Sequence, residues 1–533
     1  MKQSQDSKTP QGKHTGQGSG ASAMAEGKKI NEQMTDKELK ELLGLSEETE
    51  KEAYEIGEYS FKPEDYSDIG QAEVYAHVFN DCVRYNTAIG FLVYRNGKWE
   101  TDSNEDIKAQ GLAQDLTDAQ LEEIKNHMIA ISQKRVDATK AGNQAVQEEA
   151  DKEQKEAEDY YKFVKGRRQS KAIRDTLKET QPKLLISADL LDKDSHLLNC
   201  PDGTIDLRTG KMKAHDHLDY CTKSTTVAPS AEGAEQFREF LHNLTDGNTE
   251  EQEYLQIVAG MCAIGEVRQE KMIIAFGKGG NGKSTFFNLL SMVLGDYAGT
   301  ISPEVLIQKS KANEYYEKAD LRGKRLVVAA ELNEGVLMNT AVVKHLTSTD
   351  TIKARQIYKA PIEFKPSHTL IMHTNHLPKV DTTDAGTWDR IAVVPFTHRF
   401  RGEKGEKKNY AEELYKKCGG AVLQWIIDGA KRFIESGYQI KEPDCVKNAV
   451  AEYRSDNDYI KRFIEDECCT GQNCSVGVKE LYDSYKWYCS KNKEPGRTRK
   501  EFKTAMNEAG YPDEKKIEGI KYLGIRLKEG TTK

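Results

Sequence analysis

Four solidly apolar runs alternate with segments of helical pattern between Lys271 and Phe400. In chain order they are MIIAFG, RLVVAAE, HTLIMHTN and RIAVVPF. Strands that are apolar throughout, without polar alternation, are typical of a parallel sheet covered by helices on both faces. The pattern therefore predicts an α/β unit with a buried, largely parallel sheet.

The region before this unit has a mainly helical pattern. The segment AEVYAHVFNDCVRY, from Ala72, predicts a helix, and FLVYRNGKWE predicts two short strands around a turn at Asn96-Gly97. The charged stretch of residues 118–180 predicts a solvated helical hairpin that Gly142 interrupts. Residues 1 to about 35 are rich in Gly, Ser, Gln and Lys, and this composition predicts disorder.

A turn-rich β segment, LLNCPDGTIDLRTGKM, begins at Leu197, and we expect Gly203 and Gly210 each to occupy a tight turn. A basic unit runs from about Val476 to Lys528, where two helical segments precede two short strands. This order predicts a winged-helix-like domain. It fits a DNA-binding wing and a partner-docking domain equally well.

These patterns predict a multidomain α/β chain of five segments. They are a disordered or short-helical N-terminal segment (1–70), a helix-rich N-terminal domain (71–233), the unit with the parallel sheet (234–400), its helical tail (401–470) and a winged-helix-like basic domain (471–533).

Composition narrows the class of protein further. The 533 residues are 37% hydrophobic and 31% charged, as in a charge-rich globular protein. No apolar run approaches the roughly 18 residues that span a bilayer, and the N-terminus lacks a signal-peptide pattern. We therefore expect a cytoplasmic protein without a membrane partner. The net charge of −8 argues against a uniformly basic nucleic-acid coat but leaves room for local basic surfaces.

The ten cysteines are spread along the chain, and only Cys468, Cys469 and Cys474 cluster. There is no CxxC pair, and no histidine lies near the cluster in sequence. This favours reduced thiols over a zinc site.

A complete GxxxxGK[ST] motif follows the first apolar run and opens a helical segment. We expect its backbone N–H groups and the helix N-terminus to hold the phosphates of ATP. Lys283 would contact the β- and γ-phosphates, and Ser284 would hold Mg²⁺. The nucleotide-binding residues predicted by the motif are Gly277, Lys278, Gly279, Gly280, Asn281, Gly282, Lys283, Ser284 and Thr285.

Polar residues end the next two apolar runs. Glu331 follows RLVVAA, with Glu334 nearby, and is the candidate to handle Mg²⁺ and water; the alternative is an ordinary surface strand end. Asn375 ends HTLIMHT and could orient the attacking water, or it could be a turn residue. Arg390 precedes the fourth run, where it could act as an arginine finger on a neighbouring subunit or be a surface arginine.

Five segments, taken in their order along the chain, resemble the core of superfamily 3 helicases. They are GKGGNGKST, VVAAELNEG, KHLTSTDTIKARQIY, HTLIMHTNHLP and WDRIAVVPF. They resemble more closely the phage/plasmid primase-helicase family, which includes poxvirus primase-helicases. LLNCPDGTIDLRTG resembles the segment before that family's motor, and GGAVLQWIIDGAKRFIESG resembles its helical tail. The resemblance covers the chain from about Ala72 onward. It implies an AAA+-like motor that forms a hexameric ring and translocates on single-stranded DNA.

The resemblance also assigns roles to single positions. It places Lys283 and Ser284 in the first motif, Glu331 in the second, Asn375 in the third and Arg390 at the finger position. Many superfamily 3 proteins have two adjacent acidic residues in the second motif, whereas this chain has Ala330-Glu331, which leaves the role of Glu334 open.

The family also places a β-hairpin between the second and third motifs into the ring's pore. The segment from Asp350 to Pro361 has the pattern of a strand, a tip and a return strand. Lys353, Arg355 and, near the tip, Lys359 are the DNA contacts that we predict. The alternative is that these side chains protect a sheet edge.

The sequence thus favours an ATP-dependent replicative DNA helicase of a phage, plasmid or other mobile element, with ATP and Mg²⁺ as cofactors. Its expected partners are single-stranded and forked DNA, further copies of the chain, and a separate primase or initiator. We expect no primase activity, because only about 70 residues precede the matched region and they carry no zinc pattern. The alternatives are an ATP-switched, origin-binding initiator and an RNA helicase of viral type.

Overall fold

The computed structural model describes residues 58–102, 106–308, 314–355, 361–380, 385–402, 407–492, 494, 496–517 and 519–529. The disorder predicted for residues 1 to about 35 and the predicted DNA contact Lys359 both lie outside this part of the chain. The chain divides into two compact units, residues 1–94 with 100–188, and residues 95–99 with 189–533. Among the described residues, no helix is long and apolar enough to cross a membrane.

The first unit is mainly helical. Its helices and strands are α3 (Asp68–Val78), β1 (Val83–Asn86), β2 (Gly90–Arg95), α4 (Ile107–Ala141), α5 (Gln144–Arg167) and α6 (Ser170–Thr180). Strand β3 (Lys98–Thr101) follows the Asn96-Gly97 turn, and both residues of that turn have positive φ, so the predicted hairpin is confirmed. The helix predicted for AEVYAHVFNDCVRY ends at Val78, and the remainder continues into β1, so this prediction was wrong for its last residues.

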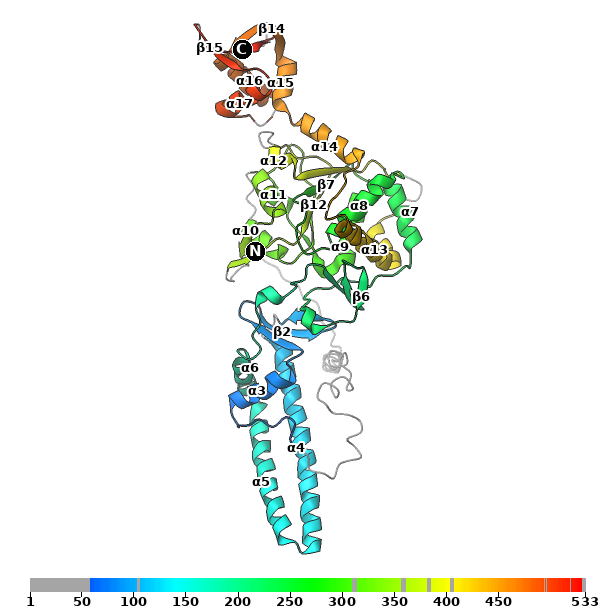
Figure 1. Ribbon diagram of the computed structural model, residues 1–533, viewed down its shortest axis with the longest axis vertical. Coiled ribbons are helices and arrows are strands. Elements are labelled where there is room, and N and C mark those ends of the chain that lie inside the picture. Colours follow the sequence, from blue (N-terminus) through cyan, green and yellow to red (C-terminus); the bar gives the residue numbers. More distant parts are fainter. Residues whose placement is uncertain are drawn as a thin grey trace, which may run out of the picture. The chain divides into compact units, whose positions relative to one another are not determined.

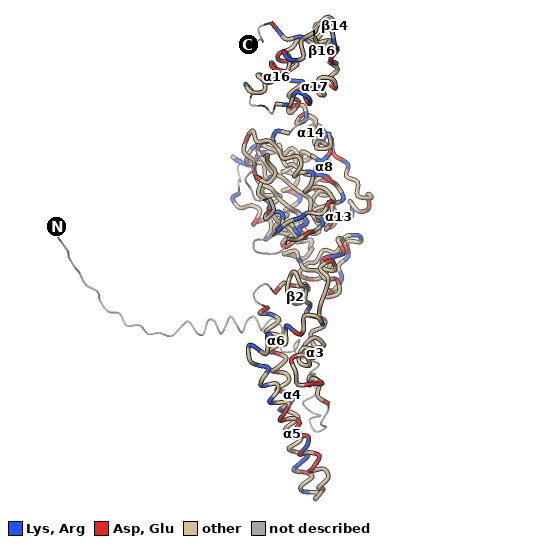
Figure 2. The backbone as a smooth tube through the Cα atoms, turned by 90° about the vertical axis from the view of Figure 1, so that its left-hand side faces the viewer, with Lys and Arg blue, Asp and Glu red and all other residues tan. Residues whose placement is uncertain are grey.

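The predicted helical hairpin is formed by α4 and α5. Gly142 separates the two helices, with φ of +65°, a left-handed conformation that glycine adopts without strain. Both signs of charge are interspersed along the hairpin in Figure 2, and ion pairs such as Lys134–Glu153, at 2.8 Å, join its helices. These features confirm the solvated hairpin predicted from the charge pattern.

The second unit begins with a small antiparallel sheet and two helices that precede the parallel sheet. These elements are η2 (Ala188–Leu190), β4 (Leu197–Cys200), β5 (Gly203–Asp206), β6 (Lys211–Lys213), η3 (His217–Asp219), α7 (Ala234–Leu244) and α8 (Thr249–Met261). Gly210 has φ of +70° and lies in a turn, as predicted. Gly203 instead lies within β5, where an added Cβ would meet the Lys213 carbonyl oxygen at 2.4 Å. Close approach of two strands, and not a tight turn, therefore requires this glycine.

The parallel sheet and its connections form the centre of the second unit (Figure 1). They are β7 (Met272–Phe276), α9 (Lys283–Leu294), η4 (Gly295–Tyr297), β8 (Ala298–Thr300), η5 (Pro303–Leu306), α10 (Glu314–Glu317), η6 (Lys318–Leu321), β9 (Leu326–Ala330), α11 (Thr340–Thr347), β10 (Ile352–Arg355), β11 (Pro361–Phe364), β12 (Thr369–Thr374), α12 (Ala385–Trp388) and β13 (Ile391–Pro395). The five strands are parallel and ordered β13-β7-β12-β9-β8. This confirms the predicted parallel sheet, whose arrangement is consistent with a P-loop domain.

Alternate residues of each strand face two separate cores. Ile273 and Ala275 of β7 pack with α8, α9 and the long helix α13 (Tyr410–Glu435). Met272 and Ile274 pack on the opposite face with α11. In Figure 1, α8, α9 and α13 accordingly lie on one side of the sheet and α11 on the other. Burial on both faces explains why these strands lack polar alternation.

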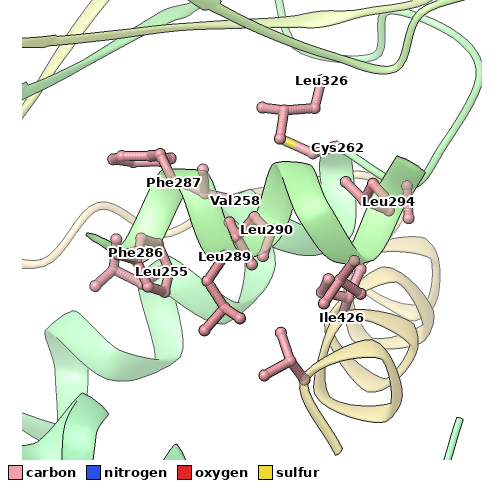
Figure 3. Close-up of a cluster of buried hydrophobic side chains, with 14 of the residues drawn as sticks. Leu255, Val258, Cys262, Phe286, Phe287, Leu289, Leu290, Leu294, Leu326 and Ile426 are labelled. Carbon is pink, nitrogen blue, oxygen red and sulfur yellow. The ribbon is translucent and has the colours of Figure 1, made fainter. Parts of the chain in front are cut away.

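Helix α9 is held rigidly in the first of these cores. Figure 3 shows its side chains Phe286, Phe287 and Leu290 against residues of α8, and Ile426 of α13 lies close by. Each fully buried Leu or Phe contributes roughly 1.5–3 kcal/mol from removal of apolar surface from water. The helix that follows the P-loop therefore cannot shift without disturbing several packed side chains.

The chain ends in a separate small core. Helix α14 (Asp444–Asp456) precedes this core and packs instead against the parallel sheet, through Val446 on one face and Tyr453 on the other. The separate core is formed by α15 (Tyr459–Glu467), β14 (Cys468–Gly477), α16 (Val478–Asn492), α17 (Arg499–Glu508), β15 (Asp513–Lys516) and β16 (Gly519–Leu527). The two predicted helices and two predicted strands are confirmed as α16, α17, β15 and β16. Strand β14, which the sequence did not predict, pairs with β16 to give a sheet ordered β14-β16-β15. Cys468, Cys469 and Cys474 lie on this strand as free thiols.

Candidate functional site

The GxxxxGKS loop joins the buried strand β7 to the first turn of α9, as predicted. Lys278 and Gly279 lie at its exposed tip, whereas Gly277 and Asn281 are buried. Gly280 and Gly282 have φ of +88° and +79°, which a residue with a side chain would adopt only with strain. The loop thus turns back so that α9 begins directly at Lys283.

A segment that follows β13 supports the loop from outside. The Asn281 side-chain amide donates a hydrogen bond to the His398 carbonyl oxygen at 2.6 Å. The backbone N–H of Phe400 donates to the Gly280 carbonyl oxygen at 2.9 Å. One of these bonds is donated by a side chain of the loop and the other joins two backbone groups, so together they hold the loop against the supporting segment.

Lys283 connects the loop to the middle of the sheet. Its ammonium group donates to the Gly277 carbonyl oxygen at 2.6 Å and to the Asn375 side-chain oxygen at 3.1 Å. The residue is only 5% exposed, and this burial lowers the pKa of the ammonium group, while the nearby Glu331 carboxylate acts in the opposite direction. The positive charge of Lys283 is therefore held inside the site by Asn375, which follows β12. The negative charge of Glu331, which follows β9, partly offsets it.

Glu331 follows β9 in a strained backbone conformation. Its φ is +40°, in the left-handed region, and its N–H donates to the His373 carbonyl oxygen at 2.9 Å. Such a conformation costs of order 1–3 kcal/mol for a residue with a side chain, and residues of this kind cluster at functional sites. The carboxylate is exposed and interacts electrostatically with Lys283. Glu334 lies three residues further along, on the exposed loop.

His373 is a site residue that the sequence did not single out. It is 6% exposed at the end of β12, and burial lowers the pKa of its imidazole. The Glu331 carboxylate raises that pKa and the Lys283 ammonium lowers it, so the imidazole lies near both groups. The second histidine of HTLIMHTN was the available signal, because it lies two residues before the candidate Asn375.

The parallel sheet thus brings Lys283, Glu331 and Asn375 together at the carboxyl ends of three adjacent strands, β7, β9 and β12. Ser284 is exposed and Thr285 is half-buried on the first turn of α9. The hydroxyl of Ser284 and the carboxylate of Glu331 are hard oxygen donors, which suit Mg²⁺. The donor chemistry therefore fits a divalent cation beside a bound phosphate.

Arg390 lies at the opposite edge of the sheet. Its carbonyl oxygen accepts a hydrogen bond from the N–H of Met272, the first residue of β7, at 2.7 Å. Its guanidinium group forms an ion pair with Glu270, and its side chain is 25% exposed. The structure therefore does not bring Arg390 to the P-loop of its own chain.

The predicted hairpin between the second and third motifs is formed by β10 and β11. The strands pair antiparallel, with Lys353 opposite Glu363 and Arg355 opposite Pro361. Ile352 and Ala354 are buried, and Lys353 and Arg355 are exposed on the other face. Lys353 forms an ion pair of 3.0 Å with Glu363, in which both side chains remain mostly exposed.

Comparison with known proteins gives matches over most of the described chain. Residues 72–246 match the family described as "D5 N terminal like", and residues 275–390 match a "Family of unknown function". A protein of Acanthamoeba polyphaga mimivirus named "Putative helicase" is 28% identical over 323 residues, which are 56% of this chain and 34% of that protein. A "Putative primase" of African swine fever virus is 23% identical over the same shares of each chain.

A further viral relative and a solved structure are similar over part of the chain. A "Putative helicase" of Sputnik virophage is 25% identical over 233 residues, or 38% of this chain and 30% of that protein. A solved structure described as "The A form apo structure of NrS-1 C terminal region-CTR" is 15% identical, covers 56% of this chain and 64% of that chain, and has a TM-score of 0.34.

The chain spans about a third of the length of these curated relatives. The matched regions include both the segment before the P-loop and the motifs from the loop to Arg390. The resemblance found in the sequence is thereby confirmed: one segment of the chain matches the "D5 N terminal like" family, and the chain is similar to viral proteins named putative helicases and putative primases.

Proposed function

We propose that this protein is an ATP-dependent DNA helicase that translocates on single-stranded DNA as a ring. One observation carries the proposal: the hydrogen bond of 3.1 Å from Lys283 to Asn375, beside the Glu331 carboxylate, which acts to raise the pKa of the same lysine. A P-loop lysine that lies beside a carboxylate and an amide, each at the end of a strand, can couple phosphate binding to activation of the attacking water. The similarity to viral proteins named helicases supports the choice of a nucleic-acid motor.

In this proposal each residue of the site acts on the bound ATP. Lys283 binds the β- and γ-phosphates, and the backbone N–H groups of residues 277–285 surround them. Ser284 and Glu331 would hold Mg²⁺, which would supply positive charge beside the phosphates. Asn375 orients the attacking water. On binding, the phosphates compete with the Gly277 carbonyl for the lysine ammonium group.

The proposal extends to assembly and to DNA. Arg390 would act as a finger on the ATP of the next subunit in a hexameric, AAA+-like ring, which is consistent with its distance from its own P-loop. The β10–β11 hairpin would enter the pore, with Lys353, Arg355 and Lys359 contacting DNA phosphates. Its exposed cationic face supports this use, although Glu363 offsets part of the charge.

We further propose that the protein replicates the DNA of a phage, plasmid or other mobile element in the host cytoplasm. It would do so without primase activity of its own, and a separate primase or initiator would assist it. The five-segment division (1–70, 71–233, 234–400, 401–470 and 471–533) is proposed as its domain organisation, with a winged-helix-like domain at the end.

ATP turnover with and without DNA tests the proposal. We expect single-stranded DNA to stimulate hydrolysis, Lys283→Ala to abolish it, and Glu331→Gln to bind ATP but turn it over slowly. Glu334→Gln is the matched control, an exposed carboxylate three residues away, and it should remain active. Stimulation by RNA in place of DNA would favour an RNA helicase. ATP binding without DNA-stimulated turnover would favour an ATP-switched initiator.

A further inference from the structure

The turn between α7 and α8 is bonded to the segment that supports the P-loop, residues 396–401. Asp246 of this turn accepts a hydrogen bond from Nδ1 of His398 at 2.7 Å and another from the Thr397 hydroxyl at 3.0 Å. The bond from His398 lowers the pKa of the Asp246 carboxyl group, so the carboxylate is ionised and accepts both bonds. One carboxylate therefore holds two consecutive residues of the supporting segment.

The turn that carries Asp246 has a defined shape. Asp246 and Gly247 have φ of +49° and +77°, and aspartate tolerates the left-handed conformation better than most residues do. The N–H of Gly247 donates to the His242 carbonyl oxygen at 2.8 Å, which closes the turn. The two helices that it joins pack in the same core as α9. The turn is thus a firm anchor for the supporting segment.

The supporting segment is bonded on its other side to the middle of the P-loop. The N–H groups of Phe400 and Arg401 donate to the Gly280 carbonyl oxygen at 2.9 and 3.3 Å. The His398 carbonyl oxygen accepts the Asn281 side-chain amide at 2.6 Å. His398 therefore joins the two contacts, because its ring is bonded to Asp246 and its carbonyl group to the loop.

These bonds set the direction of one peptide group of the P-loop. The Gly280 carbonyl oxygen points toward the supporting segment, since it accepts the bonds from Phe400 and Arg401. In a planar trans peptide the N–H of the next residue points the opposite way, so the N–H of Asn281 is directed away from the segment. Backbone N–H groups of a P-loop are the groups that surround a phosphate. The position of the supporting segment therefore decides whether this N–H is presented to a phosphate.

We propose that Asp246 is a positioning residue of the nucleotide site, which holds the supporting segment where it orients the Gly280–Asn281 peptide for phosphate binding. The inference rests on the proposed function, because it takes the P-loop to bind the phosphates of ATP. It adds a residue from outside the motif, at the end of the segment that matches the "D5 N terminal like" family. The Asp246 side chain is 54% exposed, so it contributes little to packing and its removal should spare the fold.

The test measures the binding of ATP and of inorganic tripolyphosphate to Asp246→Gly protein, with Mg²⁺ and without DNA. Glycine adopts the left-handed conformation of residue 246 without strain, so this variant removes the carboxylate and keeps the turn. Because loss of a hydrogen bond changes an equilibrium constant by about three- to tenfold, both ligands should bind more weakly by about that factor. The kcat at saturating ATP should stay within about twofold, since Asp246 does not touch the reacting atoms. Asp246→Asn keeps one acceptor oxygen and should recover part of the lost affinity.

Three comparisons separate positioning from a general loss of structure. Thr397→Val removes one of the two bonds without changing residue 246, and it should weaken both ligands in the same proportion but to a smaller extent. In a double-mutant cycle, Asp246→Gly should have a smaller effect in Asn281→Ala protein, because the bond from the loop to His398 is already lost. Glu250→Gln, at an exposed carboxylate in the first turn of α8, is the matched control and should bind both ligands normally.

Unchanged binding of both ligands to Asp246→Gly protein would overturn the proposal. Weakening of ATP alone would also overturn it, since Asp246 would then act on the base or ribose. So would a lower melting temperature that accompanies the lost affinity and is not partly restored in Asp246→Asn, because that result shows a purely structural role. If Asp246→Gly does not fold, Thr397→Val decides by the same two affinities.

Lys283→Ala separates a failure of this proposal from a failure of the proposed function. If Lys283→Ala leaves tripolyphosphate binding intact, the P-loop assignment itself fails. Binding that requires Lys283 but is insensitive to Asp246→Gly disproves only the positioning role.

Discussion

Replacing Arg390 by alanine tests whether neighbouring subunits share one catalytic site. Arg390 adjoins the first residue of β7, and the P-loop begins after the last. Five residues of strand span about 16 Å at roughly 3.3 Å per residue, which is longer than an arginine side chain. In the proposed ring, the arginine would therefore act on the ATP of another subunit and not on that of its own chain. We expect Arg390→Ala to bind ATP and assemble normally but to hydrolyse ATP slowly.

The size of the effect follows from two considerations. Arginine fingers contribute about 10³–10⁵ in rate in well-studied phosphoryl-transfer systems, so even a much weaker finger would be detectable. In a mixture, each active site requires an intact P-loop from one subunit and an intact arginine from the next. When Arg390→Ala and Lys283→Ala subunits mix equally and at random in a ring, about one quarter of the interfaces meet this condition.

The assay is ATP turnover per protomer as a function of composition and concentration. Both parent variants should be nearly inactive, and their equal mixture should recover up to about one quarter of wild-type activity. Wild-type turnover per protomer should rise with concentration as rings form. Co-purification of differently tagged subunits establishes that mixed rings are present. If mixed rings form and their activity never exceeds the sum of the parents, the shared site is refuted.

Three further predictions concern stability and the site. Burial raises the pKa of Glu251 to about 7, so the folded state favours its protonated form and the free energy of unfolding should fall by roughly 2–3 kcal/mol between pH 4.5 and 7. Thermal melts across this pH range should show that Glu251→Gln removes this pH-dependent loss of stability. Arg325 donates to the carbonyl oxygens of Ala263 and Leu197 at 2.5 and 2.7 Å, so Arg325→Ala should lower the melting temperature by on the order of 10 °C, whereas Arg322→Ala should change it little. Asn375→Ala should raise the KM for ATP less than it lowers kcat, because the amide acts mainly on the attacking water; equal changes in both would contradict that role.

The sheet could be predicted from the sequence because burial on both faces leaves a local signal. Each apolar run became a strand, and the P-loop has the strand and helix that its motif requires. Strand β1 was missed because its four residues follow a helix directly and are stabilised by pairing with β2. Strand β14 was missed because its polar, cysteine-rich sequence resembles a loop, and its partner β16 is distant in the chain.

The candidate site could be predicted only in part. Lys283, Glu331 and Asn375 end segments with clear patterns, so parallel strands were expected to bring them to one edge. The positive φ of Glu331 and the placement of His373 depend on the pairing of β9 with β12, which no local pattern encodes. A pocket of about 990 Å³ beside the P-loop likewise joins α7, the P-loop and α13, segments separated by long stretches of chain.

Strand displacement from a forked duplex tests the central claim most directly. The wild-type protein, ATP and Mg²⁺ are incubated with duplexes that carry a 3′ tail, a 5′ tail or both, and with Lys283→Ala protein as the control. A ring that translocates on single-stranded DNA should displace the strand from the fork and from one of the two single-tailed duplexes, and only with an intact Lys283. DNA-stimulated ATP hydrolysis without displacement from any of the three substrates would contradict the account.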